Sequence, residues 1–204
     1  MELANHIVTN DDIIYLDETT FNGYMRQERA WQYRDIPVVL PLPVKRLKGV
    51  TLYGAIGQCV QAGFAFMTAE KTVIQSFLDF IEVLKSQLLT NERPILVLDQ
   101  HRAHTSPKVR PLLEASFRVL WVPVSSCEFN SIEWLWAHIK RRFRKTLTQK
   151  VRAIKEQTDL IAEVDTAAEQ VPQRVATQML GANRKYIAGH LANSIDPDYA
   201  TVTF

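Results

Sequence analysis

The chain has few cysteines, few glycines and no long apolar run. Its 204 residues include two cysteines, Cys59 and Cys127, and seven glycines. Two such cysteines give neither the spacing of a zinc site nor a disulfide framework, so we expect a reduced intracellular protein. No run approaches the roughly 18 apolar residues that a membrane span needs, and the first ten residues do not resemble a secretory signal. These absences predict no membrane partner.

Positive and negative charges nearly balance over the whole chain, which has a formal net charge of +2. Locally they do not balance, because the stretch 134–155 contains no Asp or Glu. The basic residues in this stretch are Lys140, Arg141, Arg142, Arg144, Lys145, Lys150, Arg152 and Lys155. Such a stripe indicates either a solvated helix face or a surface that binds a polyanion.

The remaining composition is that of a globular protein, with 47% apolar and 23% charged residues. Apolar periodicity predicts strands at 12–17, 49–56, 61–68, 95–98 and 117–122. It predicts helices at 71–89, 106–115 and 130–147, followed by a largely helical stretch at 150–195 that is interrupted at Pro172 and Gly181. Because strands alternate with helices in the second half, we expect an α/β layer structure with parallel pairing.

Three acidic residues stand out against this pattern. Asp17 ends the apolar run 13–16, Asp99 ends the run 95–98, and Glu133 lies on the basic helix. If the two strands are neighbours, both aspartates lie at the edge of the sheet where α/β folds place their sites. Taken singly, each acid is better explained as a cap or a surface charge. Together, they predict carboxylate ligands for Mg²⁺ or Mn²⁺, with two ions about 3.5–4 Å apart.

Three sequence blocks around these acids resemble the catalytic blocks of mariner-superfamily DDE transposases. The first is Asp-Glu-Thr-Thr-Phe at 17–21, followed by Trp31. The second is Leu-Asp-Gln-His-Arg-Ala-His at 98–104. The third is Val-Pro-Val-Ser-Ser at 122–126 with Phe-Asn-Ser-Ile-Glu-Trp-Leu-Trp at 129–136, in which Glu133 follows Asp99 by 34 positions.

The resemblance implies an RNase H-like fold, with a mixed five-stranded sheet flanked by helices and a C-terminal helical extension. Residues 1–147 would form the catalytic domain, with a clamp-like excursion at 18–48, and residues 148–204 would form the extension packed on it. Asp17, Asp99 and Glu133 would be both the catalytic triad and the metal ligands. The implied reaction is metal-dependent DNA cleavage followed by strand transfer.

Three further residues match supporting positions of these blocks: His104, Gln100 and Asn130. His104 would orient a carboxylate or contact phosphate, although a structural histidine is an equal alternative. Gln100 stands where the family usually has Asn and still offers an amide, and Asn130 suits a helix N-cap. The pair His101 and His104 has a spacing that also suits zinc, but no nearby Cys or further His supports that interpretation. Trp134 and Trp136 fit helix packing better than base stacking.

The implied partners are transposon-end and target DNA, and a second copy of the chain in the active form. The candidate DNA-binding residues are Lys140, Arg141, Arg144, Lys145, Lys45, Arg46 and Lys48. Only 16 residues precede Asp17, too few for the helix-turn-helix module that such proteins carry. We therefore expect that module to be encoded upstream or lost. The implied location is intracellular, in the nucleus of a eukaryote or the cytoplasm and nucleoid of a bacterium.

Two other hypotheses remain open at this point. The chain is alternatively a truncated or repurposed remnant that binds DNA or another partner without transposing. It is alternatively another RNase H-like nuclease, such as a resolvase, although the first block disfavours this.

Overall fold

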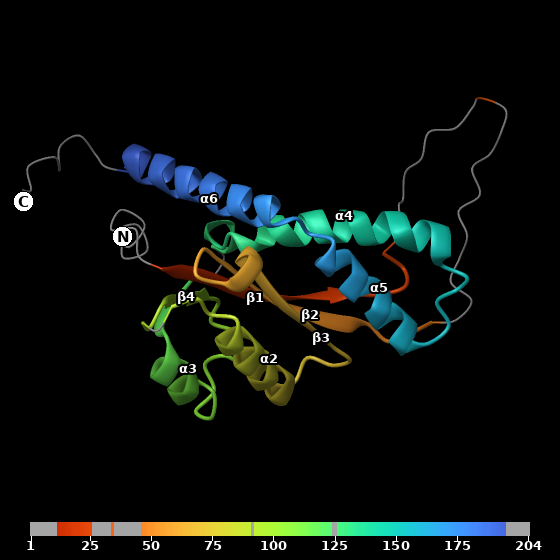
Figure 1. Ribbon diagram of the computed structural model, residues 1–204, viewed down its shortest axis with the longest axis horizontal. Helices are drawn as coiled ribbons and strands as arrows, with labels where there is room; N and C mark the ends of the chain where they lie inside the picture. Colours follow the sequence, from red (N-terminus) through yellow and green to blue (C-terminus); the bar gives the residue numbers. More distant parts are fainter. Residues whose placement is uncertain (1–11, 26–33, 35–45, 91, 124–125, 195–204) are drawn as a thin grey trace, which may run out of the picture.

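A computed structural model describes residues 12–25, 34, 46–90, 92–123 and 126–194. Its centre is a five-stranded sheet in the order β3-β2-β1-β4-β5 (Figure 1). The strands are β1 (Ile13–Phe21), β2 (Val50–Gly57), β3 (Phe64–Ala69), β4 (Ile95–Leu98) and β5 (Arg118–Trp121). The α-helices are α2 (Ile74–Ser86), α3 (Arg110–Ser116), α4 (Ile132–Lys150), α5 (Gln157–Glu169) and α6 (Gln173–Ser194).

Strand directions make the sheet mixed, as the sequence predicted. The hairpin side, β1-β2-β3, is antiparallel, whereas β1-β4-β5 is parallel. The central strand β1 therefore pairs along most of its length with β2 and only through Ile13–Tyr15 with β4. Because β4 is so short, no described strand pairs with β1 beyond Tyr15 on that side.

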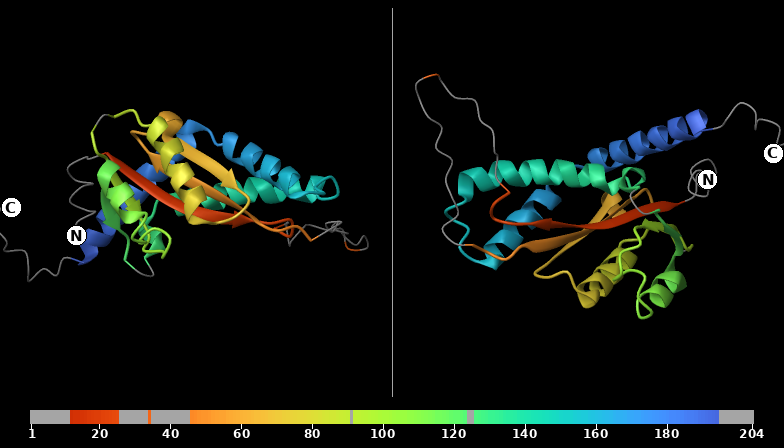
Figure 2. Two further views of the ribbon diagram at one scale, coloured as in Figure 1. Left: turned by 90° about the horizontal axis from the view of Figure 1, so that it is seen from below. Right: turned by 180° about the vertical axis from the view of Figure 1, so that it is seen from behind.

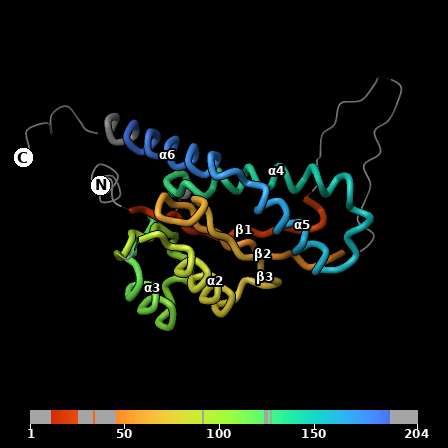
Figure 3. The backbone as a smooth tube through the Cα atoms, viewed as in Figure 1, coloured from red at the N-terminus to blue at the C-terminus, as the bar shows by residue number. Residues whose placement is uncertain are grey.

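Helices cover both faces of the sheet. Helices α4, α5 and α6 lie on one face and α2 and α3 on the other, as the side and rear views also show (Figure 2). The backbone trace shows α4 and β1, far apart in sequence, lying side by side (Figure 3). The sheet is therefore buried from both sides, and β4, Ile-Leu-Val-Leu, is fully apolar for that reason.

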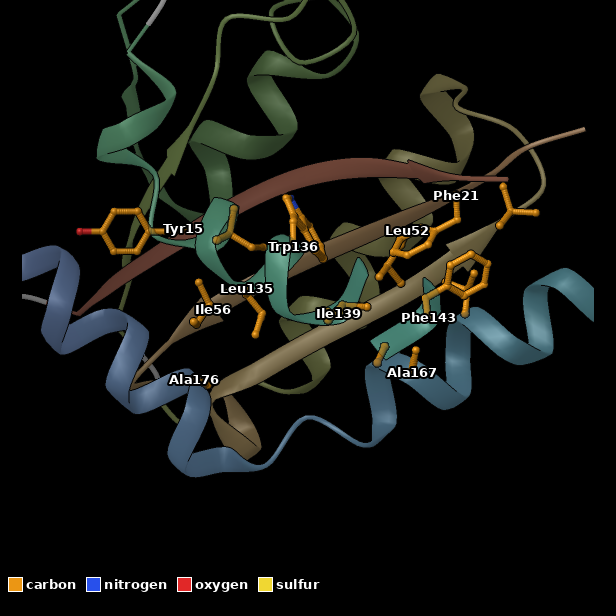
Figure 4. Packing of buried hydrophobic residues seen from close by; sticks show 14 of the residues in the cluster. Tyr15, Phe21, Leu52, Ile56, Leu135, Trp136, Ile139, Phe143, Ala167 and Ala176 are labelled. Atoms are coloured by element: carbon orange, nitrogen blue, oxygen red, sulfur yellow. The ribbon is translucent and has the colours of Figure 1, made fainter. Parts of the chain in front are cut away.

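The two sides of β1 contribute to two separate apolar clusters. Ile13, Tyr15 and Phe21 pack with α4, whereas Ile14 and Leu16 pack with α2 and α3. On the α4 side, Trp136, Ile139 and Phe143 lie over β1 and β2, with Ala167 and Ala176 of α5 and α6 beside them (Figure 4). This alternation decides which side of the sheet each polar residue of β1 faces.

Several predicted boundaries were wrong, beginning with β1. Strand β1 does not end at Asp17 but continues to Phe21, because residues 18–21 pair with β2. The β-branched residues Thr19 and Thr20 favour this extension. Asp17 therefore lies in the middle of a strand, where it is more buried than a residue at the end of a strand would be.

Other corrections concern turns and helix starts. Strand β3 starts later than predicted, because residues 61–63 form the 3₁₀ turn η1 (Gln61–Gly63), in which Gly63 has φ of 77°. Helix α3 starts at Arg110 instead of residue 106, with Pro111 in its first turn, where a missing N–H costs nothing. Gly181 lies inside α6 and does not interrupt it. Most of the predicted excursion lies outside the described residues, at 26–33 and 35–45.

The C-terminal helices share the core of the sheet. Leu160 and Val164 of α5 and Ala176 and Leu180 of α6 belong to the same buried cluster as α4. The region predicted as an extension therefore contributes to the stability of the sheet layer. None of the helices in the described part of the chain is both long and apolar enough to span a bilayer.

Candidate active site

Strand register places the first two acids level with each other. The parallel pairing of β1 with β4 aligns Ile13 with Ile95 and Tyr15 with Val97. Continuing this register by two residues brings Asp17 opposite Asp99, just past the end of β4. Asp17 belongs to the side of β1 that faces α4, whereas Asp99 is on the loop and 54% exposed.

A tryptophan of α4 holds the Asp17 carboxylate. Trp136 is buried, and its Nε1–H donates a hydrogen bond of 3.1 Å to Asp17 Oδ2. Gly54 is the β2 residue paired with Asp17. A Cβ at Gly54 would overlap the Trp136 ring and lie 2.9 Å from Phe64 Cε2. Because Gly54 has no side chain, the Trp136 indole can pack directly against the sheet at this position.

Glu133 lies in the first turn of the same helix and faces the same region. Burial first, and then repulsion from Glu133, raise the pKa of Asp17 to about 7, while the Trp136 hydrogen bond opposes this. Burial and the charge of Asp99 likewise raise the pKa of Glu133, against the attraction of Lys140. Glu133 is therefore close enough to both aspartates for its charge to interact with theirs.

Lys140 is a basic residue whose charge interacts with this acidic group. It lies two turns after Glu133 on the same face of α4, and Arg144 continues the stripe. Burial lowers the pKa of Lys140, as does Arg144, while Glu133 and Asp17 raise it. Lys140 is thus part of the acidic site as well as of the basic face, which the sequence alone did not indicate.

His104 connects Asp99 to a residue on the opposite side of β1. Its ring is 1% exposed, with Nδ1 2.8 Å from Asp99 Oδ1 and Nε2 3.2 Å from Glu18 Oε2. Burial opposes protonation, but these two carboxylates outweigh it and raise the pKa of His104 to about 9. The hydrogen bond from His104 lowers the pKa of Asp99. Asp99 is therefore fixed and ionised even though it is exposed.

Gln100 and Asn130 bond to the backbone around the acids. Gln100 Nε2 donates to the Val122 carbonyl at 3.3 Å, which joins the loops after β4 and β5. Asn130 Nδ2 donates to the Leu16 carbonyl at 3.1 Å, directly before Asp17. Asn130 also caps α4 as predicted, because its Oδ1 accepts a hydrogen bond of 3.4 Å from the Ile132 N–H, whereas Ser131 has helical φ and ψ and makes no side-chain cap bond. Asn130 therefore both caps the start of α4 and anchors it to β1.

The predicted DNA-binding residues fall into two groups. Arg141, Arg144 and Lys145 are exposed on α4. Arg46 and Lys48 are exposed and line a hollow of about 590 Å³ beside the end of β1. Lys45 lies outside the described residues. Near the same end of β1, Phe21 packs edge-on against Phe143 of α4, with ring centroids 5.0 Å apart.

The donor set of the acids fits a hard divalent cation. Oxygen ligands from Asp17, Asp99 and Glu133 suit Mg²⁺ or Mn²⁺, and a cation would relieve the repulsion that raises two of their pKa values. Asp99 offers one free oxygen, because its contacts with described residues all fall on Oδ1. The residues present therefore suit such an ion.

Comparison with known proteins agrees with this arrangement. A family model for DDE superfamily endonucleases matches residues 12–156, more than half of the chain. The chain belongs to this family. The matched segment contains all three acids, His104 and most of α4. A search of curated proteins finds no match.

Solved structures of a mariner transposase share the fold of this DDE endonuclease. A pre-cleavage Mos1 transpososome matches with a TM-score of 0.64 at 13% identity, over 94% of this chain and 59% of that one. A mariner Mos1 paired-end complex with Mg matches with a TM-score of 0.62 at 16% identity, over 92% and 59%. A Mos1 strand transfer complex matches with a TM-score of 0.53 at 14% identity, over 89% of this chain and 59% of that one. The chain thus has the RNase H-like fold and spans about 59% of the length of these proteins.

Three residues of the site were not predicted as part of it. Trp136 was assigned to packing alone, and Gly54 and Glu18 were not singled out. The alternation of β1 gives the signal for Glu18, since it must face away from Asp17. No sequence signal shows that an indole of α4 bonds to a β1 carboxylate, because that contact joins segments 119 positions apart.

Proposed function

We propose that this chain is the catalytic domain of a mariner-like DDE transposase that cleaves DNA at element ends and joins the freed end to target DNA. The observation that carries the proposal is the register of β1 and β4. Continued by two residues it aligns Asp17 with Asp99, and the charge of Glu133 interacts with both, which supports grouping these three acids. Membership of the DDE endonuclease family supports the same assignment.

In this proposal Asp17, Asp99 and Glu133 hold two Mg²⁺ or Mn²⁺ ions. When bound, such ions activate a nucleophile and stabilise the leaving oxygen of a phosphodiester. The protein supplies rigid geometry: the Trp136 indole orients Asp17, and His104 orients Asp99. Rigid elements keep ligands within the narrow tolerance that metal catalysis requires. Water first attacks the phosphodiester, and the freed 3′-hydroxyl then attacks a target phosphodiester in line.

The stripe of α4 supports a path for the DNA backbone. Arg144 continues from Lys140 away from the acids, and Arg141 and Lys145 are exposed beside it. Arg46 and Lys48 extend positive charge to the end of β1. Such residues position phosphates without reading bases. In this proposal a helix-turn-helix module binds the element ends in a sequence-specific way, and the active form is a homodimer.

The decisive test is metal-dependent nicking of DNA by the purified chain. Supercoiled plasmid is incubated with the chain and Mn²⁺ or Mg²⁺, and nicked product is measured on gels. We expect nicking in metal and none in chelator. Glu133→Gln should lower the rate at least about 100-fold, since even changes outside the ligand shell cost 10–100-fold.

Glu128→Gln is the matched control, because it removes an exposed carboxylate five positions from Glu133. Its nicking rate should equal that of the wild type. A terminal-repeat-binding module fused to the chain gives the second substrate test, on DNA with element ends. Intact DNA in Mn²⁺ with both the chain and the fusion would reject the enzyme and favour the remnant.

A further inference from the structure

A second group of metal-type donors lies on the side of β1 opposite Asp17. One atom from each of Glu18, His101 and His104 lies within 4.8 Å of the other two. Glu18 points to this side because it continues the face of Ile14 and Leu16. Asp17 points to the α4 side, where Trp136 holds it. Asp17 and Glu18 therefore lie on opposite sides of the strand, whereas His104 connects the second group to Asp99.

The local contacts preorganise these donors. His104 is buried, with its ring 4.5 Å from that of Phe77, so it has little rotational freedom. Its Nδ1 bonds to Asp99 Oδ1, which leaves Nε2 facing Glu18 at 3.2 Å. Metal-bound histidines commonly donate their other N–H to a carboxylate in this way. His101 completes the group, with Nδ1 4.0 Å from Glu18 Oε1.

Glu18 has an oxygen that the described residues do not satisfy. Its Oε2 is buried and makes no hydrogen bond of good geometry with any of them, although His104 Nε2 is nearby. A buried carboxylate oxygen without such a bond costs free energy unless a cation or donor offsets it. In the absence of a metal the charge of His104 offsets this oxygen, and a cation held between Glu18 and the two histidines would take over that role.

A hollow of about 550 Å³ gives access to the group. Its walls include the three donors and the N-terminal end of α2 at Val73, Ile74 and Gln75. Three protein donors and an open side leave room for a water molecule as a fourth ligand. Two imidazole nitrogens and one carboxylate oxygen select Zn²⁺ and similar transition metals over Mg²⁺.

We propose that Glu18, His101 and His104 form a Zn²⁺-type transition-metal site, separate from the three acids of the active site. The metal takes one oxygen of Glu18 and one ring nitrogen of each histidine, with water from the hollow. Binding releases the Nε2 proton of His104 to solvent, while Nδ1–H keeps its bond to Asp99. The metal thereby fixes the loop that carries Asp99, a consequence that rests on the proposed function.

Zn²⁺ binding to the full chain tests the site directly. Binding is measured by competition with a chromophoric chelator, in metal-free buffer and in excess Mg²⁺. We expect one Zn²⁺ per chain at a site that Mg²⁺ does not displace. His101→Ala and Glu18→Gln should each weaken binding at least tenfold. His101 is 54% exposed, so its loss should leave the fold intact, which thermal unfolding checks.

Two variants serve as matched controls. His138→Ala removes a histidine outside the group, and Arg102→Gln alters a residue that lines the same hollow but offers no metal ligand. Both should bind Zn²⁺ as the wild type does. Equal affinity of His101→Ala and wild type, or no bound Zn²⁺ in the wild type, would overturn the proposal and leave His104 as a structural bridge between Glu18 and Asp99.

Glu133→Gln separates this proposal from the proposed function. It should lose nicking but retain Zn²⁺, because Glu133 lies on the α4 side of the sheet. If Glu133→Gln loses Zn²⁺ together with nicking, the two groups of ligands form a single site and the proposal fails. Nicking by His101→Ala in Mg²⁺ shows independently whether the active site is intact.

Discussion

At the scale of single residues, Asp17 combines a proposed metal-binding role with a cost in stability. Its carboxylate is largely buried, interacts with the charge of Glu133, and accepts a hydrogen bond from Trp136. Functional sites often retain such unfavourable charges because the ligand, and not the fold, balances them. The charge of Asp17 should therefore be visible in the pH dependence of folding.

Asp17→Asn should stabilise the metal-free protein at pH 8. The folded pKa of Asp17, about 7, lies above its ordinary value of 3.8. The folded state favours the protonated form of Asp17. The protein is therefore most stable, with respect to this group, below pH 3.8, and it loses that stability as the pH rises through 7. The variant should exceed the wild type by roughly 1–2 kcal/mol at pH 8 and show less loss between pH 5 and 8. Urea unfolding at both pH values measures this.

Metal provides the control for that prediction. Mg²⁺ or Mn²⁺ should raise the unfolding midpoint of the wild type and hardly change that of Asp17→Asn. The raised pKa of His104 acts in the same direction, because its stabilising contribution falls as the pH rises from its ordinary value of 6.5 through about 9. This loss is common to the wild type and Asp17→Asn, and the lowered pKa of Asp99 affects stability at more acidic pH. Equal pH profiles for both proteins would show that the Asp17 charge is already balanced.

At the scale of elements, the site depends on how closely α4 approaches β2. Trp136 packs against β2 at Gly54, which has no side chain and pairs with Asp17 of β1. Phe64 of β3 packs edge-on against the same indole. The helix and the hairpin therefore position Asp17 jointly, and a single added carbon should disturb them.

Gly54→Ala should destabilise the fold by about 1–3 kcal/mol, the usual cost of overpacking, and should reduce nicking because the indole is displaced from Asp17. Gly181→Ala is the matched control. A Cβ there meets nothing within 4 Å, and Ala in a helix should stabilise by about 0.5–1 kcal/mol. Urea unfolding and the plasmid assay are measured on both variants. Wild-type stability and activity in Gly54→Ala would show that the helix can shift without harm.

At the scale of the whole molecule, acidic and basic residues are separated along α4. The acids gather where β1, β4 and the start of α4 meet, and exposed basic residues occupy the rest of that helix. A polyanion that follows the basic face would thus be led to the acidic site. A net charge of +2 conceals this separation.

The double variant Arg141→Gln with Arg144→Gln should weaken DNA binding uniformly across sequences. Each lost phosphate contact lowers the slope of log K against log salt by about 1. Fluorescence anisotropy with labelled duplex over a series of salt concentrations measures the slope. Arg110→Gln, an exposed arginine on α3 paired with Glu114, is the control and should leave it unchanged. If the double variant and Arg110→Gln gave the same slope of log K against log salt, the DNA would bind a surface other than α4.

Much of this architecture could be predicted from local sequence. Apolar periodicity located the five strands and the main helices, because burial on one or both faces leaves a period that can be read directly. The order and spacing of the three acids indicated the DDE endonuclease family, which the family model confirms. The end of β1 was missed because pairing with β2, and not local composition, extends it to Phe21.

The sequence by itself therefore determined the type of fold and the acids around which a site is built. Only the tertiary structure decided what surrounds each acid. Which face Glu18 occupies, the Trp136 bond to Asp17, and the bridge from His104 all depend on strand register and helix placement. These contacts join residues far apart in the chain. Their strength comes from burial, which the folded chain alone creates.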